Sequence, residues 1–437
     1  MNFPQSLEYL LSLGNEVSTM KLGLGNIKKL LAALDNPHQN YLKVQVAGTN
    51  GKGSVCAFLD AICISAGIRT GLYTSPHLLS ITERIKIGGR EISEVDFAVH
   101  STKVRQTAER LLATGDLEST PTFFEQVSAI ALNVFAEEKV ELAILETGLG
   151  GRFDATTAAN AEIAVITRID LDHQEYLGET LAEIAAEKAA IIRPDSTVIV
   201  GSQKTEVERV IRGRCRELGI EPHLATTKIV TKKYDYDPSY PFQGSSFRTE
   251  RGNYPNIILG LLGKHQEENA STAIAIVEML RELGFKMSDE EVWAGLESAQ
   301  HRGRLEYIDN FLFDGAHNIG GAKALREYLD EFVTQSIIMI FGAMRDKDLA
   351  QMSDVLFPKA DRLILTTADN SRAMAATELL DFIPAGIDRK NVFLAGNVED
   401  ALKKACELSS DDGLICVTGS LYLVGEAQKI LSSEFKL

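Results

Sequence analysis

The chain has 437 residues, of which 45% are hydrophobic, and a formal net charge of −16 at pH 7. This length favours two or more domains over one, and the negative charge argues against a general nucleic-acid or membrane-surface binder. The sequence has no apolar run of the roughly 20 residues that a membrane span requires, and no basic leader at its start. Five cysteines without CxxC spacing are interpreted as buried free thiols, so we expect a cytoplasmic protein.

The first 43 residues are predicted to be mainly helical. Apolar residues recur at helical spacing in two runs, and the second run ends at a turn over residues 35–37. Gly23 and Gly25, between the runs, are interpreted as a loop that leads into a helix. They do not fit a dinucleotide fingerprint, because the position that needs a third glycine is Lys28 and no strand precedes them.

A glycine-rich stretch at residues 44–54, VQVAGTNGKGS, is the segment around which the other motifs are arranged. A β-branched run predicts a buried strand, three glycines follow, and an apolar helical pattern runs from Ser54 to about Ala66. This order predicts a phosphate cradle, because loop N–H groups point inward and the helix N-terminus adds positive potential. Lys52 would neutralise the β- and γ-phosphates, and the Ser54 hydroxyl would meet a metal or phosphate oxygen.

The loop is shorter than the common Walker pattern, which would place a glycine at the position of Val46. We interpret it as the contracted form GxxGKGS and predict a nucleoside triphosphate site. The alternative is an ordinary glycine turn with a solvated lysine.

Three more predicted strands end in polar residues that suit a metal site: 69–74, 140–145 and 161–167. Ser75 follows the first strand and would meet a metal ion or, equally, be a polar turn residue before proline. Glu146 ends the second strand before a run of glycines, which is typical of a carboxylate that holds Mg²⁺ near phosphates; a loop-capping acid is the alternative. His173 follows the third strand, and we interpret it as functional because of these neighbours, although a lone histidine is usually structural.

Helices and strands alternate through the rest of this region. The predicted segments are a basic hairpin at 83–90, helices at 94–113, 122–138, 179–192, 206–218, 263–283 and 289–298, a strand at 197–200, and a strand-rich stretch up to 260. Lys188 lies near the apolar end of helix 179–192. Its spacing alone predicts a solvated lysine paired with Glu183 or Glu187.

A basic, glycine-containing segment at residues 300–305 marks the proposed boundary between two domains, 1–298 and 299–437. It is interpreted as a hinge that binds an anion or, equally, as a solvated linker. Beyond it, predicted strands alternate with helices at 307–313, 336–341, 362–366, 391–394 and 413–417. The fold class is therefore α/β: a P-loop ATPase-like doubly wound sheet domain followed by a smaller Rossmann-like domain.

Taken together, these motifs resemble the Mur ligase superfamily and, within it, the folylpolyglutamate synthase/dihydrofolate synthase family. The resemblance covers nearly the whole chain, and the order and spacing of the motifs make it specific. The stretches that carry it are AGTNGKGSV, YTSPHL, ERIKIGG, ETGLGGRFDATT, DLDHQEYLGETLAEIAAEKAAII, GKHQEENA, GRLE, FDGAHN, FGAMRDKD and VTGSLYLVGE. The chain departs from the commonest pattern with EKAAI in place of EKAGI, and with Asp170 where glycine is more typical.

The resemblance implies ATP-driven formation of an amide between a pteridine-bearing carboxylate and the amine of L-glutamate. It implies that Lys52 and the loop residues Asn50, Gly51, Gly53 and Ser54 hold the triphosphate, and that Ser75, Glu146 and His173 ligate Mg²⁺, or Mn²⁺ in its place. Lys188 matches a lysine that is carbamylated, which would place an anion near the metal and reverses the interpretation from spacing. Lys52, Lys188 and His173 are the catalytic candidates.

The resemblance assigns further residues to the ligands. Asn269, Arg304 and Asp314 match positions that contact the nucleotide across the cleft between the domains, and His317 matches a position near the nucleotide or glutamate. The candidates for substrate binding are Arg84, Phe124, Glu125, Arg152, Asp154 and Ser420. We also expect a monomer, no nucleic-acid or membrane partner, and compatibility with a bound monovalent cation.

Two alternatives stay open at this point. Another Mur-type ligase, acting on a cell-wall precursor, would share the fold, the ATP site and the chemistry; the TSPHL and ETGLGGRFDATT stretches favour the folate branch. A nucleotide-sensing P-loop protein without ligase activity is disfavoured by the complete set of metal candidates and by the second domain. The acceptor, whether dihydropteroate, folate or both, also stays open.

Overall fold

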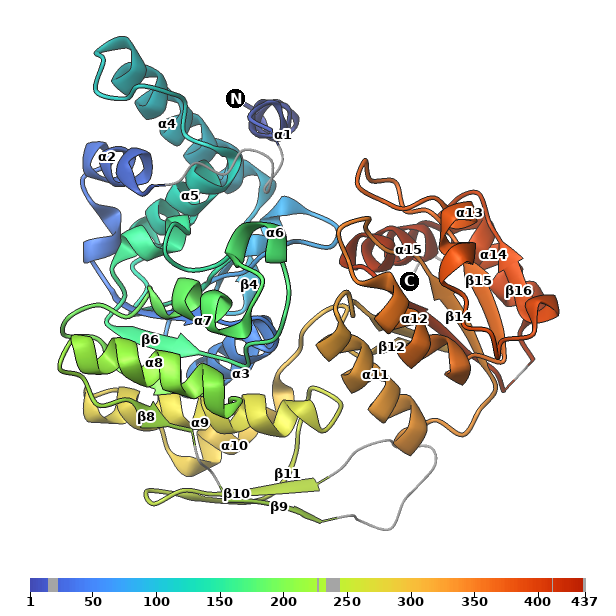
Figure 1. Ribbon diagram of the computed structural model, residues 1–437. Helices are drawn as coiled ribbons and strands as arrows, with labels where there is room; N and C mark the ends of the chain where they lie inside the picture. The colour runs from blue at the N-terminus through green and yellow to red at the C-terminus, as the bar shows by residue number, and fades with distance from the viewer. Residues whose placement is uncertain (15–22, 226–227, 233–243, 411, 435–437) are drawn as a thin grey trace.

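The computed structural model describes residues 1–14, 23–225, 228–232, 244–410 and 412–434 (Figure 1). Over these residues we find no helix with the length and apolar character that crossing a membrane requires. Four of the five cysteines are buried. Cys406 is exposed, which corrects the prediction of five buried thiols; it lies outside the buried stripe of α14 (Val398–Leu408).

The chain forms two parts, which we define by their strands: β1 to β11 in the first part and β12 to β17 in the second. The main sheet of the first part has the order β4-β3-β2-β5-β1-β6-β7-β8. Its strands are β1 (Leu42–Ala47), β2 (Thr70–Tyr73), β3 (Ile85–Ile87), β4 (Arg90–Glu91), β5 (Leu142–Glu146), β6 (Ile163–Ile166), β7 (Thr197–Val200) and β8 (His223–Leu224). All are parallel except β3 and β4, which form an antiparallel edge. The phosphate loop after β1 therefore lies at the centre of the sheet, between the ends of β5 and β6.

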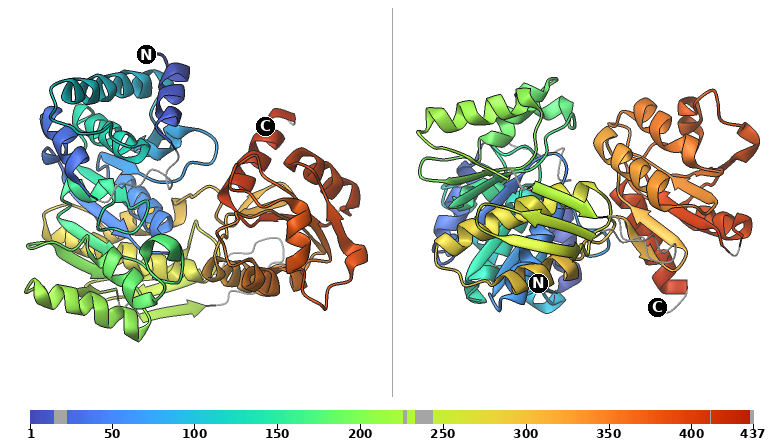
Figure 2. Two further views of the ribbon diagram at one scale, coloured as in Figure 1. Left: turned by 45° about the horizontal axis from the view of Figure 1, so that its top comes forward. Right: turned by 90° about the horizontal axis from the view of Figure 1, so that it is seen from below.

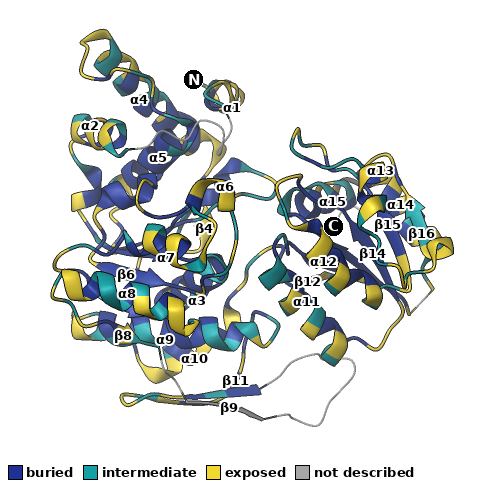
Figure 3. Cartoon of the chain, in the orientation of Figure 1, coloured by how far each residue is buried: buried dark blue, intermediate teal, exposed yellow. Residues whose placement is uncertain are grey.

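Helices cover both faces of this sheet, as buried parallel strands require (Figure 1). Side chains alternate along each strand, so Val44 and Val46 pack on one face with α3 (Lys52–Ser65), α9 (His265–Glu282) and α10 (Asp289–Ser298). The clusters on the other face include residues of further helices: α1 (Phe3–Ser12), α2 (Gly25–Ala33), α4 (Glu94–Ala113), α5 (Phe123–Glu137), α7 (Leu181–Ala189) and α8 (Thr205–Glu217). Figure 3 shows the strands buried beneath helices whose outer faces are exposed.

A small antiparallel sheet completes the first part, as the strand-rich stretch before residue 260 predicted. It has the order β11-β10-β9, with β9 (Lys228–Lys232), β10 (Gly244–Arg248) and β11 (Asn253–Ile258). Figure 2 shows it beside α9 and α10. Phe247, Tyr254 and Ile257 anchor it, because they are buried in the same core as α3.

The second part is a six-stranded sheet of order β12-β13-β17-β14-β15-β16. Its strands are β12 (Glu306–Ile308), β13 (Phe311–Asp314), β14 (Ile337–Phe341), β15 (Arg362–Leu365), β16 (Val392–Leu394) and β17 (Leu414–Thr418). Helices α11 (Ile319–Phe332) and α12 (Leu349–Leu356) pack on one face, and α14 and α15 (Leu421–Glu434) pack on the other. The second doubly wound sheet is confirmed.

One strand of the second part was predicted wrongly. Residues 307–313 do not form a single strand; β12 and β13 are a hairpin that turns at Asp309 and Asn310. Asp309 has a φ of +51°, a conformation that aspartate adopts more readily than most residues. The sheet is therefore parallel except at this edge.

Helix boundaries differ from the predictions beside the candidate site. α3 begins at Lys52, two residues before the predicted start, so Lys52 and Gly53 form its first turn. α7 is shorter than the predicted helix and begins with a capping box between Thr180 and Glu183. A separate short helix, α6 (Gln174–Leu177), precedes it.

The two parts are closely packed near the hinge. A Cβ on Gly425 in α15 would overlap with the carbonyl oxygen of Leu78, so a side chain does not fit there. Gly303, with a φ of +67°, turns the hinge beside the side chains of Leu78 and Val424. Leu78 lies three residues after Ser75, so the segment that carries this candidate metal ligand rests directly on the second part.

Candidate active site

The phosphate loop is enclosed by side chains that leave room only for glycine. Gly51 has a φ of +88°, and a Cβ there would overlap with Oδ1 of Asn269. A Cβ on Gly48 would overlap with the hydroxyl of Thr167. The loop leads into the 14-residue α3, whose N-terminal N–H groups and dipole face it. This backbone has the geometry of an anion cradle.

Two lysines converge on one carbonyl of this loop. Lys52 donates from Nζ to the oxygens of Gly48 at 3.1 Å and Thr49 at 3.2 Å, and Lys188 donates to the Gly48 oxygen at 2.8 Å. Burial, followed by the charge of Lys52, lowers the pKa of Lys188 to about 7. Lys188 is therefore buried at the loop and is not the solvated lysine that its spacing suggested.

Glu146 and Ser75 meet at the ends of adjacent strands. Glu146 is buried, and its Oε2 accepts the backbone N–H of Ser75 at 3.0 Å. A Cβ on Gly53 would lie 3.5 Å from Oε1 of Glu146, so the carboxylate stands beside the first turn of α3. Burial raises the pKa of Glu146, and the nearby Lys52 partly offsets this effect.

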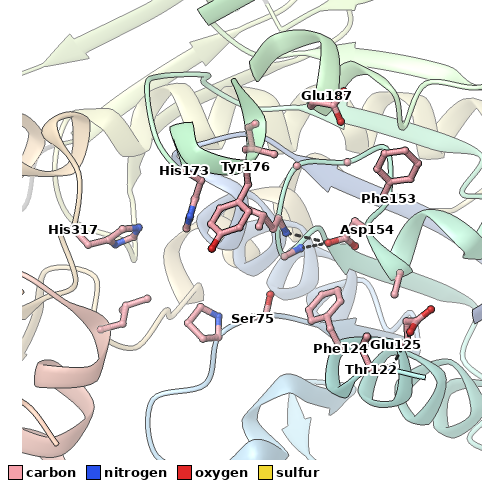
Figure 4. Close-up of a pocket in the computed structure, with 18 of the residues that line it drawn as sticks. Ser75, Thr122, Phe124, Glu125, Phe153, Asp154, His173, Tyr176, Glu187 and His317 are labelled. Carbon is pink, nitrogen blue, oxygen red and sulfur yellow. Dashed lines mark hydrogen bonds between the residues drawn. The ribbon is translucent and has the colours of Figure 1, made fainter. Parts of the chain in front are cut away.

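His173 occupies the turn after β6, and its φ of +50° is left-handed. It lines the same cavity as Ser75 (Figure 4). Burial, the largest influence, lowers the pKa of His173 to about 4. The ring is therefore neutral at pH 7, which is the form that binds a metal ion.

The donor set of Ser75, Glu146 and His173 fits a divalent cation such as Mg²⁺ or Mn²⁺. Among the residues that the structure describes, no group of three or more histidine, cysteine, aspartate or glutamate side chains forms a metal site. A cation beside the loop would therefore be completed by phosphate oxygens and water, as is usual for Mg²⁺ with nucleotides.

Asn269 and Ser54 are linked through α9. Nδ2 of Asn269 donates to Oε1 of Gln266 at 2.9 Å, and Nε2 of Gln266 donates to Oγ of Ser54 at 3.2 Å. Oδ1 of Asn269 faces Gly51. The structure thus brings Gly51, Ser54 and Asn269, all predicted to bind the nucleotide, together at the start of α3.

Arg304 and Asp314 connect the hinge to the second sheet. Asp314, at the end of β13, accepts the N–H groups of Leu305 and Ala316, each at 3.0 Å. Arg304 donates from Nη1 to the oxygen of Gly315 at 3.2 Å. Burial raises the pKa of Asp314, and the charge of Arg304 opposes that shift.

A cavity of about 390 Å³ lies between the two parts (Figure 4). Its lining residues from the first part include Ser75, Thr122, Phe124, Glu125, the glycine-rich turn 148–151, Phe153, Asp154, His173, Tyr176 and Leu177. Those from the second part are His317, Met344, Lys347, Arg372, Ser420, Leu421 and Tyr422. The cavity therefore contains the candidate metal ligands Ser75 and His173 together with residues of both parts.

Four of the predicted substrate-binding residues line this cavity: Phe124, Glu125, Asp154 and Ser420. Arg84 and Arg152 do not. The Arg84 side chain is buried, and its Nε donates to Nδ1 of His77 at 2.8 Å. Nε of Arg152 donates to Oε1 of Glu187 at 2.8 Å. Their roles toward the substrate stay predictions.

Of the four residues that line the cavity, the three polar ones also accept hydrogen bonds from backbone N–H groups and so stabilise the local backbone. Oε2 of Glu125 accepts the N–H of Thr122 at 2.8 Å and caps α5. Asp154 accepts the two N–H groups of residues 148–149 at 2.9 and 3.0 Å. Ser420 accepts a backbone N–H at the start of α15 at 3.1 Å. Phe124 instead presents its ring to the cavity.

Comparisons with known proteins agree with these features. Residues 46–277 match the model for the Mur ligase middle domain, and residues 303–421 match the model for the Mur ligase glutamate ligase domain. The dihydrofolate synthase/folylpolyglutamate synthase of Bacillus subtilis is 33% identical over 419 residues, which cover 94% of this chain and 95% of that protein. This chain belongs to the folylpolyglutamate synthase/dihydrofolate synthase family.

Solved structures extend the family match to three dimensions. The folylpolyglutamate synthase of Mycobacterium tuberculosis, complexed with ADP and AMPPCP, has a TM-score of 0.89 and 30% identity, covering 98% of this chain and 99% of that one. The Escherichia coli FolC protein, in complex with DHPP and ADP, has a TM-score of 0.86 and 28% identity, covering 100% and 99%. The predicted family and fold class are thereby confirmed.

Family membership places the chain among the ATP-dependent ligases that join an acid to an amino acid. It does not favour the alternative of a ligase for cell-wall precursors, because the Bacillus subtilis and Escherichia coli relatives are both named dihydrofolate synthase/folylpolyglutamate synthase. The dihydrofolate synthase/folylpolyglutamate synthase of Escherichia coli K12, for example, is 30% identical over 432 residues, covering 98% of this chain and 95% of that protein.

Several lining residues of this family member were not predicted. Tyr176 and Lys347 lie inside motifs that carry the resemblance, HQEYLG and FGAMRDKD, so those motifs could have indicated them. Phe153 and Met344 also lie inside such motifs, ETGLGGRFDATT and FGAMRDKD, whereas Arg372 had no signal in the sequence. They reach the cavity only because the two sheets face each other across it.

Proposed function

We propose that the protein joins L-glutamate to the carboxylate of a dihydropteroate or a folate, with ATP as energy source and an acyl phosphate as intermediate. The observation that carries this proposal is that Ser75 and His173 share one cavity with an aromatic surface. Phe124, Phe153 and Tyr176 supply that surface, and flat rings suit a pteridine or benzoyl group (Figure 4). The Escherichia coli relative, solved with DHPP and ADP together, supports a common site.

The reaction follows from the low reactivity of a carboxylate. A carboxylate oxygen of the acceptor attacks the γ-phosphorus of ATP, the bond to the bridging oxygen breaks, and ADP leaves. The amine of L-glutamate then attacks the acyl carbon, and the tetrahedral intermediate releases phosphate and a proton to give the amide. Lys52, Arg304 and the N-terminus of α3 would stabilise the charge on the transferred group.

The cavity walls would also protect the intermediate. An acyl phosphate hydrolyses in water, so both steps need a site from which water is excluded. The two parts supply opposite walls, which would close around the substrates when the parts are held together.

Ser75, Glu146 and His173 would hold the divalent cation. A structure of a bifunctional folylpolyglutamate synthase/dihydrofolate synthase with Mn, AMPPNP and L-glutamate bound, at 28% identity, 99% coverage of this chain, 98% of that chain and a TM-score of 0.83, supports a metal together with a nucleotide. A bound cation would offset charge on the phosphate oxygens.

Lys188 would act in a carbamylated form. Its pKa of about 7 leaves a substantial neutral fraction at neutral pH, and the neutral amine is the form that adds to CO₂ with loss of a proton. Because Lys188 and Lys52 both approach the Gly48 carbonyl, two positive charges lie close together. Conversion of Lys188 to a carbamate would replace this repulsion with attraction.

The proposal also includes the domain boundary, the oligomeric state, the location and a monovalent cation. The domain boundary at 298/299 agrees with the gap between the two matched family models, which end at 277 and begin at 303. A cytoplasmic location is proposed from the cysteine pattern, and a monomeric state and a bound monovalent cation are proposed with the family resemblance.

A phosphate-release assay tests the function. With ATP, Mg²⁺ and L-glutamate present, release should depend on dihydropteroate or a reduced folate, and mass spectrometry should find the glutamylated product. A cell-wall precursor in place of the folate acceptor is the control and should give no release. EDTA should stop turnover, and excess Mn²⁺ should restore part of it. Release that needs no L-glutamate, or turnover only with the cell-wall precursor, would contradict the proposal.

A further inference from the structure

The two parts are joined through a buried carboxylate, that of Asp172. Its Oδ1 accepts from Nζ of Lys347 at 2.8 Å, and its Oδ2 accepts from Nδ2 of Asn318 at 3.2 Å. Asp172 follows β6 in the first part, whereas both donors belong to the second. The side chains of Asp172 and Lys347 are each only 8% exposed.

Asn318 extends this contact to the phosphate loop. The same Nδ2 donates to Oδ1 of Asn50 at 3.0 Å, and Oδ1 of Asn318 accepts the N–H of Gly321 to cap α11. A Cβ on Gly320 would lie 2.5 Å from Nδ2 of Asn50, so the start of α11 is close against the loop. Asn318 therefore ties the start of α11 to both Asp172 and the phosphate loop.

The contact lies at the edge of the cavity. Lys347 and His317 line the cavity, and Nε2 of His317 lies 3.8 Å from Oδ2 of Asp172. Nε2 of His173, in the first part, lies 3.9 Å from the same oxygen. A displacement at Asp172 would therefore move the wall of the second part relative to the phosphate-binding side.

We propose that Asp172 is a positioning residue: through Lys347 and Asn318 it holds the second part at the separation from the phosphate loop that ligation requires. The effect on turnover rests on the proposed function, whereas the effect on the separation of the two parts does not. Removal of the Asp172 charge leaves the buried ammonium of Lys347 with only the partly exposed Asp346, whose Oδ2 lies 3.4 Å from Nζ, and loss of the buried partner is costly. Lys347 and Asn318 donate to different oxygens of Asp172, so in Asp172→Asn the amide oxygen could accept from one of them while the amide nitrogen presents a donor to the other.

A matched control pair lies on the surface. Nζ of Lys264, in the first part, is 2.7 Å from Oε2 of Glu331 in α11. This ion pair links the same two parts at nearly the same distance, but the Lys264 side chain is 41% exposed. Because exposed ion pairs contribute little, Lys264→Met removes an equivalent contact without changing the cavity.

Kinetics and a double-mutant cycle test the positioning role. Asp172→Asn should lower kcat at least about tenfold, and Lys264→Met should leave it within about twofold. Asp172→Asn combined with Lys347→Met should be no slower than the slower single variant, because the two residues act as one unit. Asp172→Asn combined with Lys264→Met should show the product of the two single effects.

A distance measurement provides a readout that a purely local structural role would not change. One fluorescent label is placed on the exposed thiol of Cys406, and the other on a cysteine introduced by Glu118→Cys in the first part. Energy transfer should show a longer or broader separation for Asp172→Asn and an unchanged one for Lys264→Met. Thermal unfolding of each variant checks that the fold is intact.

The proposal is overturned if Asp172→Asn keeps the wild-type separation, whatever its kcat. It is also overturned if Lys264→Met changes the separation equally, or if the effects of Asp172→Asn and Lys347→Met simply multiply. If the wild-type protein shows no glutamate-dependent turnover, the proposed function fails, and the label separation still decides the role of Asp172.

Discussion

The nucleotide end and the acceptor end of the cavity use charged side chains differently. Around the phosphate loop, lysine side chains converge on one backbone carbonyl. Near the aromatic rings that line the cavity, charged side chains form an ion pair or accept hydrogen bonds from local N–H groups. Lys52 and Lys188 share the Gly48 carbonyl, with the buried Glu146 nearby. Next to Phe153, by contrast, Arg152 is paired with Glu187, which lines the cavity.

The difference matches the two kinds of ligand. A triphosphate is held by N–H groups, cations and a metal ion, while an aromatic acceptor needs apolar surface and few polar groups. Substitutions of charged residues should therefore reduce turnover on the nucleotide side and reduce stability, or do little, on the acceptor side. Single substitutions on each side test this contrast.

Lys52→Ala should have the largest effect. Its partners in the structure are two backbone carbonyls, so the fold should survive the change. Loss of a cation at the transferred phosphoryl group should lower kcat about 10³-fold. Phosphate release measures the loss, and circular dichroism checks the fold. A folded variant with near-normal turnover would remove Lys52 from the reaction.

Asp154→Ala should reduce stability on the acceptor side. Its carboxylate accepts the N–H groups of Gly148, Leu149 and Thr156. Buried donors without partners cost about 1–3 kcal/mol each, so the free energy of unfolding should fall by about 3 kcal/mol or more. Urea denaturation measures this, and Asp154→Asn, which keeps one acceptor oxygen, should lose less. A fully stable Asp154→Ala with a raised KM for the acceptor would instead identify a substrate ligand.

Lys188→Ala should lower kcat about 10²-fold if Lys188 carries the proposed carbamate, because that anion would be lost. Acetate or formate should restore part of the activity by occupying the vacated place. Wild-type activity should also fall in CO₂-depleted buffer and return with bicarbonate. Wild-type activity that is indifferent to CO₂, together with no rescue, would show that Lys188 acts without modification.

The buried amine of Lys188 should also make the free energy of unfolding depend on pH in CO₂-free buffer. Its pKa is about 7 in the folded protein and about 10.5 in the unfolded chain, so the unfolded chain binds more protons between these values. The free energy of unfolding should therefore rise with pH across this window, by at most about 1.4 kcal/mol per pH unit. Urea denaturation at several pH values, compared with Lys188→Met, isolates this slope. Equal slopes would mean that the amine is not buried as a free base.

Arg152→Ala should have the smallest effect. The Arg152 side chain is 46% exposed and its ion pair with Glu187 is partly solvated, so stability should change by less than about 1 kcal/mol. We expect kcat and KM within about twofold of wild type, measured with the same assay. A tenfold rise in KM for either substrate would show that Arg152 leaves Glu187 to bind it, as the family resemblance predicted.

Segments with strong local signals could be predicted from the sequence. α4 was predicted at 94–113 and is found there, because Ser93 caps its start and apolar residues recur along one face. The phosphate loop was recognised from the order of strand, glycines and helix in the sequence. The structure shows why glycine is needed, because a Cβ on Gly51 would overlap with Asn269. The left-handed turn at Asp309 was missed, since β-branched and aromatic residues on both sides of it resemble one continuous strand.

Features that depend on distant contacts could not be predicted. Asp172 and Lys347 are 175 positions apart and meet only because the second sheet faces the first. Arg152 and Glu125 are charged residues that the family resemblance assigned to the substrate, yet the structure shows them paired or capping a helix. The residue type indicated a polar role without indicating its partner.

The close approach of Gly425 to Leu78 limits how this protein can be recombined with its relatives. A chimera that takes α15 from a relative with a larger residue at this position would push the Leu78 carbonyl aside. Ser75, three residues upstream, would be displaced with it, so an exchange in the C-terminal region would impair the nucleotide site in the N-terminal one. Working chimeras should keep glycine at this position or transfer the segment 75–80 along with α15.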